Sequence, residues 1–455
     1  MFVSLAAVTA ADDHDLTPTP PAPSGAQTTL TPRTPLLAPT AGQLAWQRKE
    51  LGVFFHFGVN TFAGLEWSDG TVSPTDFNPT ELDADQWVST AAVAGAKYVI
   101  LTAKHHDGFC LWPTATTDYS VASSPWRGGR GDVVAEVAAA CEKHGLELGL
   151  YLSPWDRNAA CYPDPAAYDR FYQDQLRELC TRYGKLTELW FDGAGSQGRE
   201  YDWNGIGEVI ASTQPDAMIF NMGNPTIRWV GNEDGLAADP VEYVVDRTDF
   251  SQYTTYSTKL DSALYLPPEC DVSIRKGWFW ADHDHPKALD HLLGIYYRSI
   301  GMGANLLLNL PPDNRGLLPD EDIARITEWR TELDRRFADP RSAVVGLVSS
   351  DRAGATWRAD FPAQVELDHL ELVEDYSTGQ RVEVHSVRSQ DRELAAGRTI
   401  GNKRLHAFEP TTVTTLEIRT DGQAPILQSV RGYRTGVSTV PSVAYRASTE
   451  TPDDH

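Results

Sequence analysis

The feature that most constrains the fold of this chain is a regular alternation of apolar and amphipathic segments between residues 42 and 337. Short runs such as "YVILTA" and "LELGLYLS" are almost wholly apolar, as expected for strands that are buried on both faces of a sheet. The amphipathic segments 132–145 and 165–184 each close on a glycine, which is typical of a helix end. The repeated order of strand and then helix predicts an α/β fold in which helices cover a parallel sheet.

The periodicity predicts individual elements as well as the fold class. Strands are expected at 52–58, 97–103, 146–153, 186–193, 217–223 and 304–312, and helices at 84–96, 132–145, 165–184, 203–213, 285–301 and 320–337. The sequence contains neither GxGxxG nor a P-loop, and the repeating region is about 300 residues long, so a (β/α) TIM-like barrel is favoured over a doubly wound sheet.

The pattern changes after residue 340. Segments such as "QVELDHLELVE" and "VTTLEIRT" are short strands separated by turn residues, which predicts an antiparallel β-sandwich. We therefore expect a Pro/Thr-rich arm over residues 1–41, a catalytic barrel over 42–339, and a β-sandwich with a short disordered tail over 340–455.

Charge and composition restrict the partners of the protein. With 39 basic and 63 acidic residues the net charge is −24, which disfavours binding to nucleic acid or to an anionic membrane surface. No apolar segment approaches the ~20 residues of a membrane span. Five cysteines without CxxC spacing argue against a disulfide framework or a structural zinc site. The start, "MFVSLAAVTAADDHD", lacks the basic region of a signal peptide, so we expect a cytoplasmic protein, with secretion as the alternative.

Polar side chains gather where the predicted strands end. In a (β/α) barrel these ends face the active site. Because side chains alternate along a strand, Trp190 and Asp192 share one face of "ELWFDG" and are expected to point into the barrel mouth. The other residues at such ends are His56, His105, His106 and Tyr151.

Three histidines at strand ends raise the question of a metal. The sequence has no HxH or HExxH motif, and neighbouring side chains on a strand point to opposite faces, so joint ligation by His105 and His106 would need a bulge. Neutral imidazoles that bind ligand hydroxyl groups are the better interpretation, since each offers one donor and one acceptor. We expect no metal.

Hydroxyl-binding imidazoles, a high tryptophan content of 13 residues and carboxylates together indicate glycoside chemistry. A retaining glycosidase places two carboxyl groups about 5–5.5 Å apart. Asp192 is the natural nucleophile. Its acid/base partner is expected from an aromatic-rich loop, either Glu233 in "RWVGNEDG" or Glu269 in "LPPECDVSIRKGWFW", and the spacing does not decide between them.

Eight motifs in the barrel region can be compared with those of known families. They are "HFGVNTF", "YVILTAKHHDGFCLWP", "VASSPWRGGRGDVV", "LGLYLSPWDR", "ELWFDG", "IRWVGNEDG", "SIRKGWFW" and "GANLLLNLPPDNRG", which occur in this order between about residues 45 and 320. With them the chain resembles the α-L-fucosidases of glycoside hydrolase family 29. The stretches "LVEDYSTGQRV" and "IGNKRL" are similar to the β-sandwich of that family.

The resemblance implies a retaining mechanism without metal or organic cofactor, acting on a fucosylated oligosaccharide or glycoconjugate. Asp192 would be the nucleophile, and Glu233, in a "GNE" motif similar to that of the α-1,3/1,4-specific subfamily, would be the acid/base. Residues implied to hold the fucose are His56, Glu66, Trp67, His105, His106, Tyr151 and Trp190, with Arg275, Trp278 and Trp280 at the wall of the site. Asp107 would turn the chain and fix a histidine tautomer.

Other functions compete with this interpretation. One is a broad-specificity α-L-fucosidase acting on α-1,2 and aryl fucosides. Another is a sugar-binding protein without catalysis, and a third is a metal-dependent hydrolase on the same barrel. The segment "LAADPVEYVVDRTDFSQ" departs from the family pattern and bears on the choice of aglycone.

Overall fold

The computed structural model describes residues 36–250, 257–351 and 353–443. The predicted N-terminal arm up to residue 35 and the predicted tail from residue 444 lie outside the described residues. The first described helix, α1 (Ala41–Gln47), begins at Thr40, whose hydroxyl accepts from Gln43 N while the Gln43 side chain accepts from Thr40 N. This capping box satisfies two backbone donors that would otherwise have no partner.

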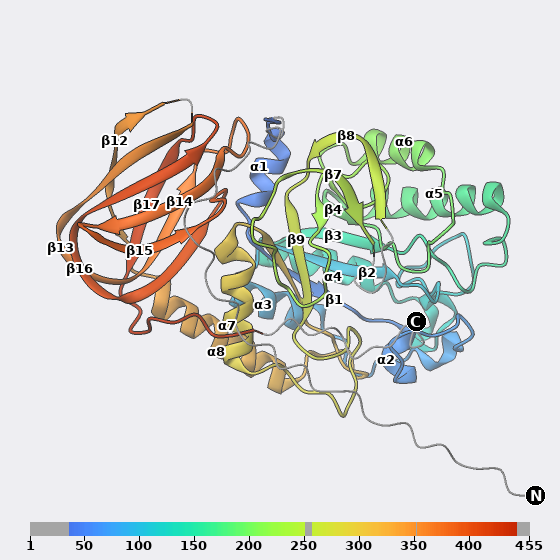
Figure 1. Ribbon diagram of the computed structural model, residues 1–455. Coiled ribbons are helices and arrows are strands. Elements are labelled where there is room, and N and C mark those ends of the chain that lie inside the picture. The colour runs from blue at the N-terminus through green and yellow to red at the C-terminus, as the bar shows by residue number, and fades with distance from the viewer. Residues whose placement is uncertain (1–35, 251–256, 352, 444–455) are drawn as a thin grey trace, which may run out of the picture. The chain divides into compact units, whose positions relative to one another are not determined.

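A parallel sheet forms the first part of the described chain. Its strands are β1 (Leu51–Phe55), β2 (Tyr98–Lys104), β3 (Glu147–Leu152), β4 (Leu186–Trp190), β5 (Met218–Phe220), β6 (Arg228–Trp229), β9 (Pro268–Ser273) and β10 (Asn305–Asn309). They pair in the order β5-β4-β3-β2-β1-β10-β9-β6. Strands β1 to β4 and β9 of this sheet are labelled in Figure 1. A parallel bridge between Phe220 and Ile227 links the two ends of this order. The sheet is a nearly closed barrel, and the predicted fold is confirmed.

Helices follow most of these strands, at the positions the periodicity predicts. They are α3 (Ala84–Ala94), α4 (Val133–His144), α5 (Pro165–Arg182), α6 (Trp203–Thr213), α7 (Leu289–Arg298) and α8 (Asp320–Phe337). In the first four of these helices an aspartate side chain at the N-cap accepts from a backbone N–H of the first turn. These caps fix the helix starts. The parallel pairing of the strands brings their carboxyl ends to one end of the barrel.

Within the described part of the barrel region, four strands were not predicted from the sequence. They are β6, β9 and the antiparallel pair β7 (Val244–Asp249) and β8 (Ser257–Tyr265). The expectation that Glu269 lies in a loop is therefore wrong. Strand β9 carries Glu269, Asp271 and Ser273 at alternating positions, all buried, so it lacks the apolar run by which the other barrel strands were recognised.

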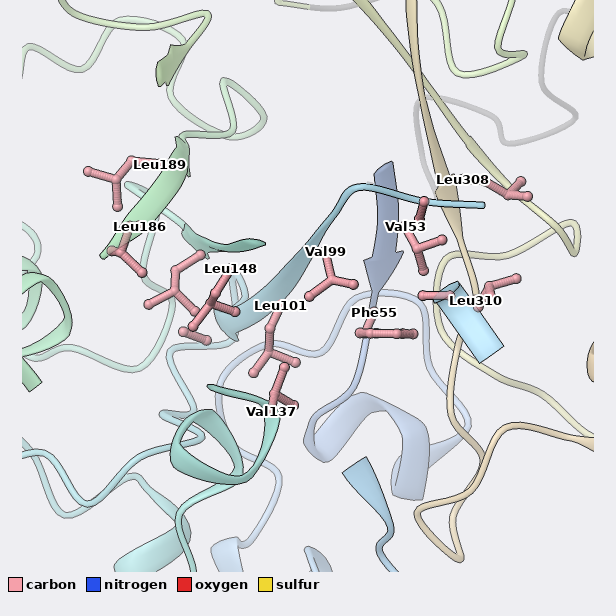
Figure 2. Close-up of a cluster of buried hydrophobic side chains, with 14 of the residues drawn as sticks. Val53, Phe55, Val99, Leu101, Val137, Leu148, Leu186, Leu189, Leu308 and Leu310 are labelled. Atoms are coloured by element: carbon pink, nitrogen blue, oxygen red, sulfur yellow. The ribbon is translucent and has the colours of Figure 1, made fainter. Parts of the chain in front are cut away.

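Alternation along the strands divides the apolar core of the barrel into two layers. Val99 and Leu101 of β2 belong to the layer that packs against the helices, and Figure 2 shows Leu101 beside Val137 of helix α4. The neighbouring residues Tyr98 and Ile100 belong instead to a separate cluster inside the barrel. Functional side chains at the barrel mouth therefore stand on an interior layer, to which helix α1 contributes Trp46.

The C-terminal sheet is antiparallel. Its strands are β11 (Arg341–Ser342), β12 (Val344–Ser350), β13 (Gly354–Glu374), β14 (Val382–Ser389), β15 (Arg392–Gly397), β16 (Arg404–Gly422) and β17 (Leu427–Tyr433). The two longest strands, β13 and β16, are paired with a shift in register between Asp360 and Val365. The sheet encloses a hydrophobic core of its own that includes Trp357, Leu370 and Leu416.

Truncation in the outer layer of the barrel tests its contribution to stability. Leu101 is 0% exposed, so Leu101→Ala is expected to lower the free energy of unfolding by about 2–5 kcal/mol through lost burial and a residual cavity. Leu347→Ala is the matched control because that leucine is 55% exposed on β12. Urea unfolding measures both variants. Equal losses in the two variants would contradict this description of the core.

None of the helices in the described residues combines the length and the apolar character that a membrane crossing needs.

Candidate active site

The side chains predicted at the strand ends come together at one end of the barrel. We call His56, His105, His106, Tyr151, Trp190 and Asp192 the strand-end cluster. The rings of His105 and His106 are 4.2 Å apart between centroids, and His105 stacks on Tyr151 at 5.6 Å. His56 lies 5.9 Å from His105 in an edge-on arrangement. Residues from strands β1 to β4 thus form one continuous polar and aromatic surface.

The proton of His56 can be assigned from its partner. Asn309 Nδ2 donates to Trp278 O at 2.8 Å, so the amide oxygen of Asn309 faces His56 Nδ1, at 2.9 Å. Because that oxygen can only accept, Nδ1 carries the hydrogen and Nε2 is left with its lone pair. Burial lowers the pKa of His56 to about 3, so the ring is neutral at neutral pH. His56 therefore offers an acceptor to a ligand hydroxyl.

His105 and His106 lie on the same side of the barrel mouth. The register between β2 and β3 shifts between Thr102 and Lys104, and both histidines follow the end of β2. Because both histidines lie beyond the end of the strand, strand alternation does not force their side chains to opposite faces. Burial lowers the pKa of His105 well below its usual value, so that ring too is neutral.

His106 is oriented by Ser153 at the end of β3. Ser153 Oγ donates to Trp155 O at 2.7 Å, and the same oxygen lies 2.7 Å from His106 Nδ1. The serine proton is thus engaged, and His106 Nδ1 must donate. This leaves Nε2 facing Asp192 Oδ2 at 3.6 Å. Both groups are then acceptors, so a ligand hydroxyl placed beside them can donate to either one.

Asp192 is held from two sides. Tyr151 Oη donates to Asp192 Oδ2 at 3.0 Å, and Asp192 Oδ1 accepts from Ala194 N at 2.8 Å. These bonds fix the carboxylate in one orientation, while 26% of its side chain remains exposed. Burial raises the pKa of Tyr151 well above its usual value, and the charge of Asp192 raises it further, so Tyr151 keeps its proton.

Aromatic rings support the cluster from within the barrel. Trp190 stacks on Phe220 at 4.0 Å between centroids and on Tyr151 at 5.3 Å. The Trp190 indole N–H donates to Glu269 Oε1 at 3.1 Å. The hydrogen bond sets the rotation of the indole, and the two stacking contacts set its plane. Trp190 and Asp192 share a strand face, as the alternation in "ELWFDG" predicts.

Glu66 and Trp67 approach the cluster from the segment after β1. The Glu66 carboxylate accepts from the backbone N–H groups of Trp278 and Phe279. Trp67 packs edge-on against His106, at 4.9 Å between ring centroids. Glu66 thus ties the segment after β1 to the "KGWFW" segment after β9, and Trp67 forms an aromatic side of the site.

Glu233 lies in the loop that follows β6. The indole N–H of Trp278 donates to Glu233 Oε2 at 3.3 Å, and the Trp278 ring lies 5.0 Å from that of His56. Trp278 therefore connects Glu233 with the strand-end cluster. Burial raises the pKa of Asp271 on β9 well above its usual value, and the charge of Glu233 raises it further, so a second carboxyl group lies near Glu233.

Glu269 is placed differently from Glu233. It is 0% exposed inside the barrel, where its carboxyl group accepts from Tyr98 Oη at 2.6 Å and from Trp190 Nε1. Glu188 is a second buried carboxyl group inside the barrel, and burial together with the charge of Glu269 raises the pKa of Glu188 well above its usual value. The structure therefore places Glu269 beneath the cluster, with its two oxygens already occupied.

The buried carboxyl pair predicts a pH dependence of stability. Burial raises the pKa of Glu269 from 4.5 to about 7, so the folded protein binds more protons than the unfolded chain within this interval. Stability then falls as the pH rises from about 4.5 towards about 7. Glu269→Gln keeps the shape and removes this titration, so the variant is expected to gain about 1–3 kcal/mol relative to wild type across that interval. Urea unfolding at several pH values measures this, and parallel curves would contradict it.

Comparison with known proteins bears directly on this site. Residues 24–331 match the family of α-L-fucosidases. The chain is 41% identical over 412 residues to Alpha-L-fucosidase 1 of Arabidopsis thaliana, which covers 81% of each chain. It belongs to the α-L-fucosidases of glycoside hydrolase family 29. The protein is a glycoside hydrolase, and its substrate is a fucosylated glycan.

Solved structures of the same family share the fold of this fucosidase. A family 29 member from an unknown rumen bacterium superposes with a TM-score of 0.79 at 32% identity, over 92% of this chain and 80% of the other. A Ruminococcus gnavus family 29 fucosidase in complex with fucose gives a TM-score of 0.77 at 29% identity, over 89% and 97% of the two chains.

One residue expected at the wall of the fucosidase site is engaged elsewhere. Arg275 donates to Asp322 at 2.9 Å and to Glu321 at 2.6 Å, both on helix α8, and its remaining terminal nitrogen donates to Asp284 O. The structure therefore does not bring the Arg275 guanidinium into the strand-end cluster. Its side chain ties the segment after β9 to α8.

Asp107 has the turn-forming position that the sequence predicts. Its carboxylate accepts from Phe109 N at 2.7 Å and lies 3.9 Å from His105 Nδ1. Gly108 follows with a φ of +88°, and a Cβ there would lie 2.4 Å from Asp156 Oδ1. Only glycine fits this turn. The buried Asp156 is in turn paired with Lys104 at 2.9 Å, which anchors the end of β2.

Two residues that shape the fucosidase site were not predicted from the sequence. Asn309 orients His56, and Ser153 orients His106. Both are polar residues at the ends of β10 and β3, so the signal that identified the other residues also marks them. Phe279, in the apolar "WFW" run, packs edge-on against His105 at 5.0 Å.

The described residues contain no group of three or more His, Cys, Asp or Glu side chains with the arrangement of metal ligands.

Proposed function

We propose that the protein is a retaining exo-α-L-fucosidase that releases terminal α-1,3/1,4-linked fucose from branched, Lewis-type glycans, with Asp192 as nucleophile and Glu233 as acid/base. The observation that carries the proposal is the Asp192 carboxylate. It is held by Tyr151 and Ala194 N, faces His106, and keeps 26% of its side chain exposed at the barrel mouth. A nucleophile needs this combination of fixed orientation and access to substrate.

The reaction follows from two carboxyl groups with different roles. Asp192 attacks the anomeric carbon while Glu233 gives its proton to the glycosidic oxygen, so that bond breaks and a fucosyl ester forms. Glu233, now a carboxylate, takes a proton from water as the water attacks the same carbon and expels Asp192. Trp278, which donates to Glu233, supports the orientation of the carboxyl group.

The strand-end cluster suits the remaining groups of a fucose ring. His56 Nε2 offers an acceptor, and His105 and His106 offer further nitrogen atoms for the sugar hydroxyls. Phe279 and Trp278 pack on His56, at 5.5 and 5.0 Å between centroids, and supply an apolar side for the fucose methyl group. The match to a fucose-bound family member supports this assignment.

The linkage preference rests on the "GNE" motif. Asn232 and Glu233 form part of it, and the resemblance connects this motif with the cleavage of branched α-1,3/1,4-fucosides. The test is fucose release from a Lewis-type branched trisaccharide, from α-1,2-fucosyllactose and from an aryl fucoside. Release from the branched sugar well ahead of fucosyllactose supports the proposal. Faster release from α-1,2-fucosyllactose would instead indicate a broad-specificity fucosidase.

The retaining mechanism has an independent test. Proton NMR of an early reaction mixture distinguishes the two anomers of the released fucose. Two displacements at one carbon restore the original configuration, so α-fucose is expected first, followed by slow mutarotation. β-Fucose as the first product would contradict the nucleophile assignment for Asp192.

A further inference from the structure

The side chain of Asn232, the residue before Glu233, makes the hydrogen bonds that close the loop bearing Glu233. Asn232 Oδ1 accepts from Asp234 N at 3.1 Å and from Leu236 N at 3.3 Å, while Asn232 Nδ2 donates to Leu236 O at 2.7 Å. Asn232 is 4% exposed. The turn from 232 to 236 therefore moves as one unit, and the position of Glu233 depends on how the two ends of this turn are anchored.

The two ends are anchored on different parts of the protein. On the incoming side, Val230 N donates to Glu269 O at 3.0 Å, which continues the pairing of β6 with β9. On the outgoing side, Ala237 N donates to Arg298 O at 2.8 Å, at the end of α7. The chain beyond Ala237 then runs to residues 239–243, whose polar groups bind the C-terminal sheet region while Val241 and Tyr243 also pack in the hydrophobic core of the barrel.

Three residues of the C-terminal sheet region bind this outgoing segment. Arg404 on β16 makes a two-point ion pair with Asp239, at 2.9 and 3.3 Å. Thr399 Oγ1 accepts from Val241 N at 3.1 Å. Gln380 pairs with the backbone as a neighbouring strand would: its Nε2 donates to Val241 O at 2.9 Å, and its Oε1 accepts from Tyr243 N at 3.0 Å.

Tyr243 completes the attachment. Its hydroxyl donates to Gly303 O at 2.7 Å and accepts from Asn402 N at 2.9 Å, and its side chain is 0% exposed. Gly401, with a φ of +63°, packs so closely that a Cβ would lie 2.3 Å from the tyrosine hydroxyl. Residues 399–404, which include the "GNKR" sequence, thus form a surface that fits the segment after the Glu233 turn.

We propose that the C-terminal sheet positions the acid/base: Arg404, Gln380 and Thr399 are positioning residues that hold the Glu233 turn at the barrel mouth. The proposal rests on the assignment of Glu233 under the proposed function. A two-point arginine–carboxylate pair restricts direction as well as distance. Arg404 is 7% exposed and Asp239 is 43% exposed, so the pair is shielded from solvent on the arginine side. Loss of the anchor would let the turn shift, and proton transfer is sensitive to such displacements.

The experiment compares two substrates in the full-length protein. A Lewis-type trisaccharide needs acid help for its leaving group, whereas 2-chloro-4-nitrophenyl fucoside needs little. For Arg404→Met, kcat/KM on the trisaccharide is expected to fall about 10–100-fold and on the aryl fucoside less than about threefold. Arg404→Lys, which keeps one ionic contact, is expected to lie between this variant and wild type.

The matched control is Arg419→Met. Arg419 is on the same strand and pairs with Asp421 at 3.1 Å, but it is 68% exposed and contacts no part of the Glu233 loop in the described residues. For Arg419→Met, kcat/KM on both substrates is expected to equal the wild-type value. If Arg404→Met does not fold, Thr399→Val replaces it, since this change removes only the acceptor for Val241 N, and a smaller loss with the same substrate dependence is expected.

The outcomes separate this proposal from the proposed function. Equal losses of Arg404→Met on both substrates, or no loss on either, would overturn it, because the sheet would then act on stability alone. Glu233→Ala is measured in parallel. If Glu233→Ala shows the strong dependence on leaving group and Arg404→Met does not, only the positioning role fails. If Glu233→Ala shows no such dependence, the acid/base assignment fails and the positioning role with it.

Discussion

Asp192→Ala is expected to reduce kcat on every fucoside by at least about 10³-fold, because the carboxylate that forms the covalent intermediate is lost. The loss should be similar for good and poor leaving groups, since no leaving group can replace the nucleophile. Azide can enter the space left by the side chain and attack the anomeric carbon once. We therefore expect azide to restore turnover of an activated aryl fucoside, with a β-fucosyl azide as product.

The control for this variant is Asp216→Ala. Asp216 is 73% exposed and pairs with Lys185 at 3.0 Å, between α6 and the strand that follows it. It is expected to retain wild-type activity. Thermal unfolding of both variants shows whether the fold is intact, because Tyr151 loses an acceptor in Asp192→Ala. Substantial fucose release by a folded Asp192→Ala variant would refute the nucleophile assignment.

Glu233→Ala is expected to show a strong dependence on the leaving group. For a Lewis-type trisaccharide kcat/KM should fall about 10²–10⁴-fold, because the departing sugar oxygen needs a proton. For an aryl fucoside whose phenol leaves without help the loss should be less than about tenfold. In this variant azide should trap the fucosyl ester on Asp192 and give an α-fucosyl azide, the opposite anomer to that from Asp192→Ala.

Comparison of Glu269→Gln with Glu233→Ala tests which of the two residues is the acid/base. The sequence pattern made both residues candidates for the acid/base, because both are carboxylates that were expected near the barrel mouth. Because Glu269 is fully buried and occupied by Tyr98 and Trp190, Glu269→Gln is expected to show no azide rescue. Azide rescue of Glu269→Gln without rescue of Glu233→Ala would transfer the acid/base role to Glu269.

Periodicity predicted the barrel and the face on which Asp192 lies. This worked because Leu189 and Phe191 pack in the outer layer, which leaves Trp190 and Asp192 on the inner face by alternation alone. The same reasoning could not choose between Glu233 and Glu269, because the choice depends on whether residues 268–273 form a strand. Strand β9 has polar residues on its inner face, and their partners, such as Trp190, come from distant segments.

The Arg275 guanidinium also lies away from the position that we expected for it at the wall of the site. The family resemblance implied a place at the wall of the site, because Arg275 belongs to the motif "SIRKGWFW". Its acidic partners, Asp322 and Glu321, lie on helix α8, and no local pattern indicates that this helix turns them towards the segment after β9. Long-range ion pairs of this kind depend on tertiary packing rather than on spacing along the chain.

The two apolar layers of the barrel have a consequence for protein engineering. Along β2, Val99 and Leu101 face the helices, whereas Tyr98 and Ile100 face the interior beneath the cluster. A designer seeking a more heat-resistant enzyme can therefore vary the first pair and its counterparts on other strands while leaving the interior untouched. Altered substrate choice, by contrast, should be sought at the exposed positions of the loops beyond the strand ends, because buried loop residues such as Phe109 and Leu111 belong to the outer layer.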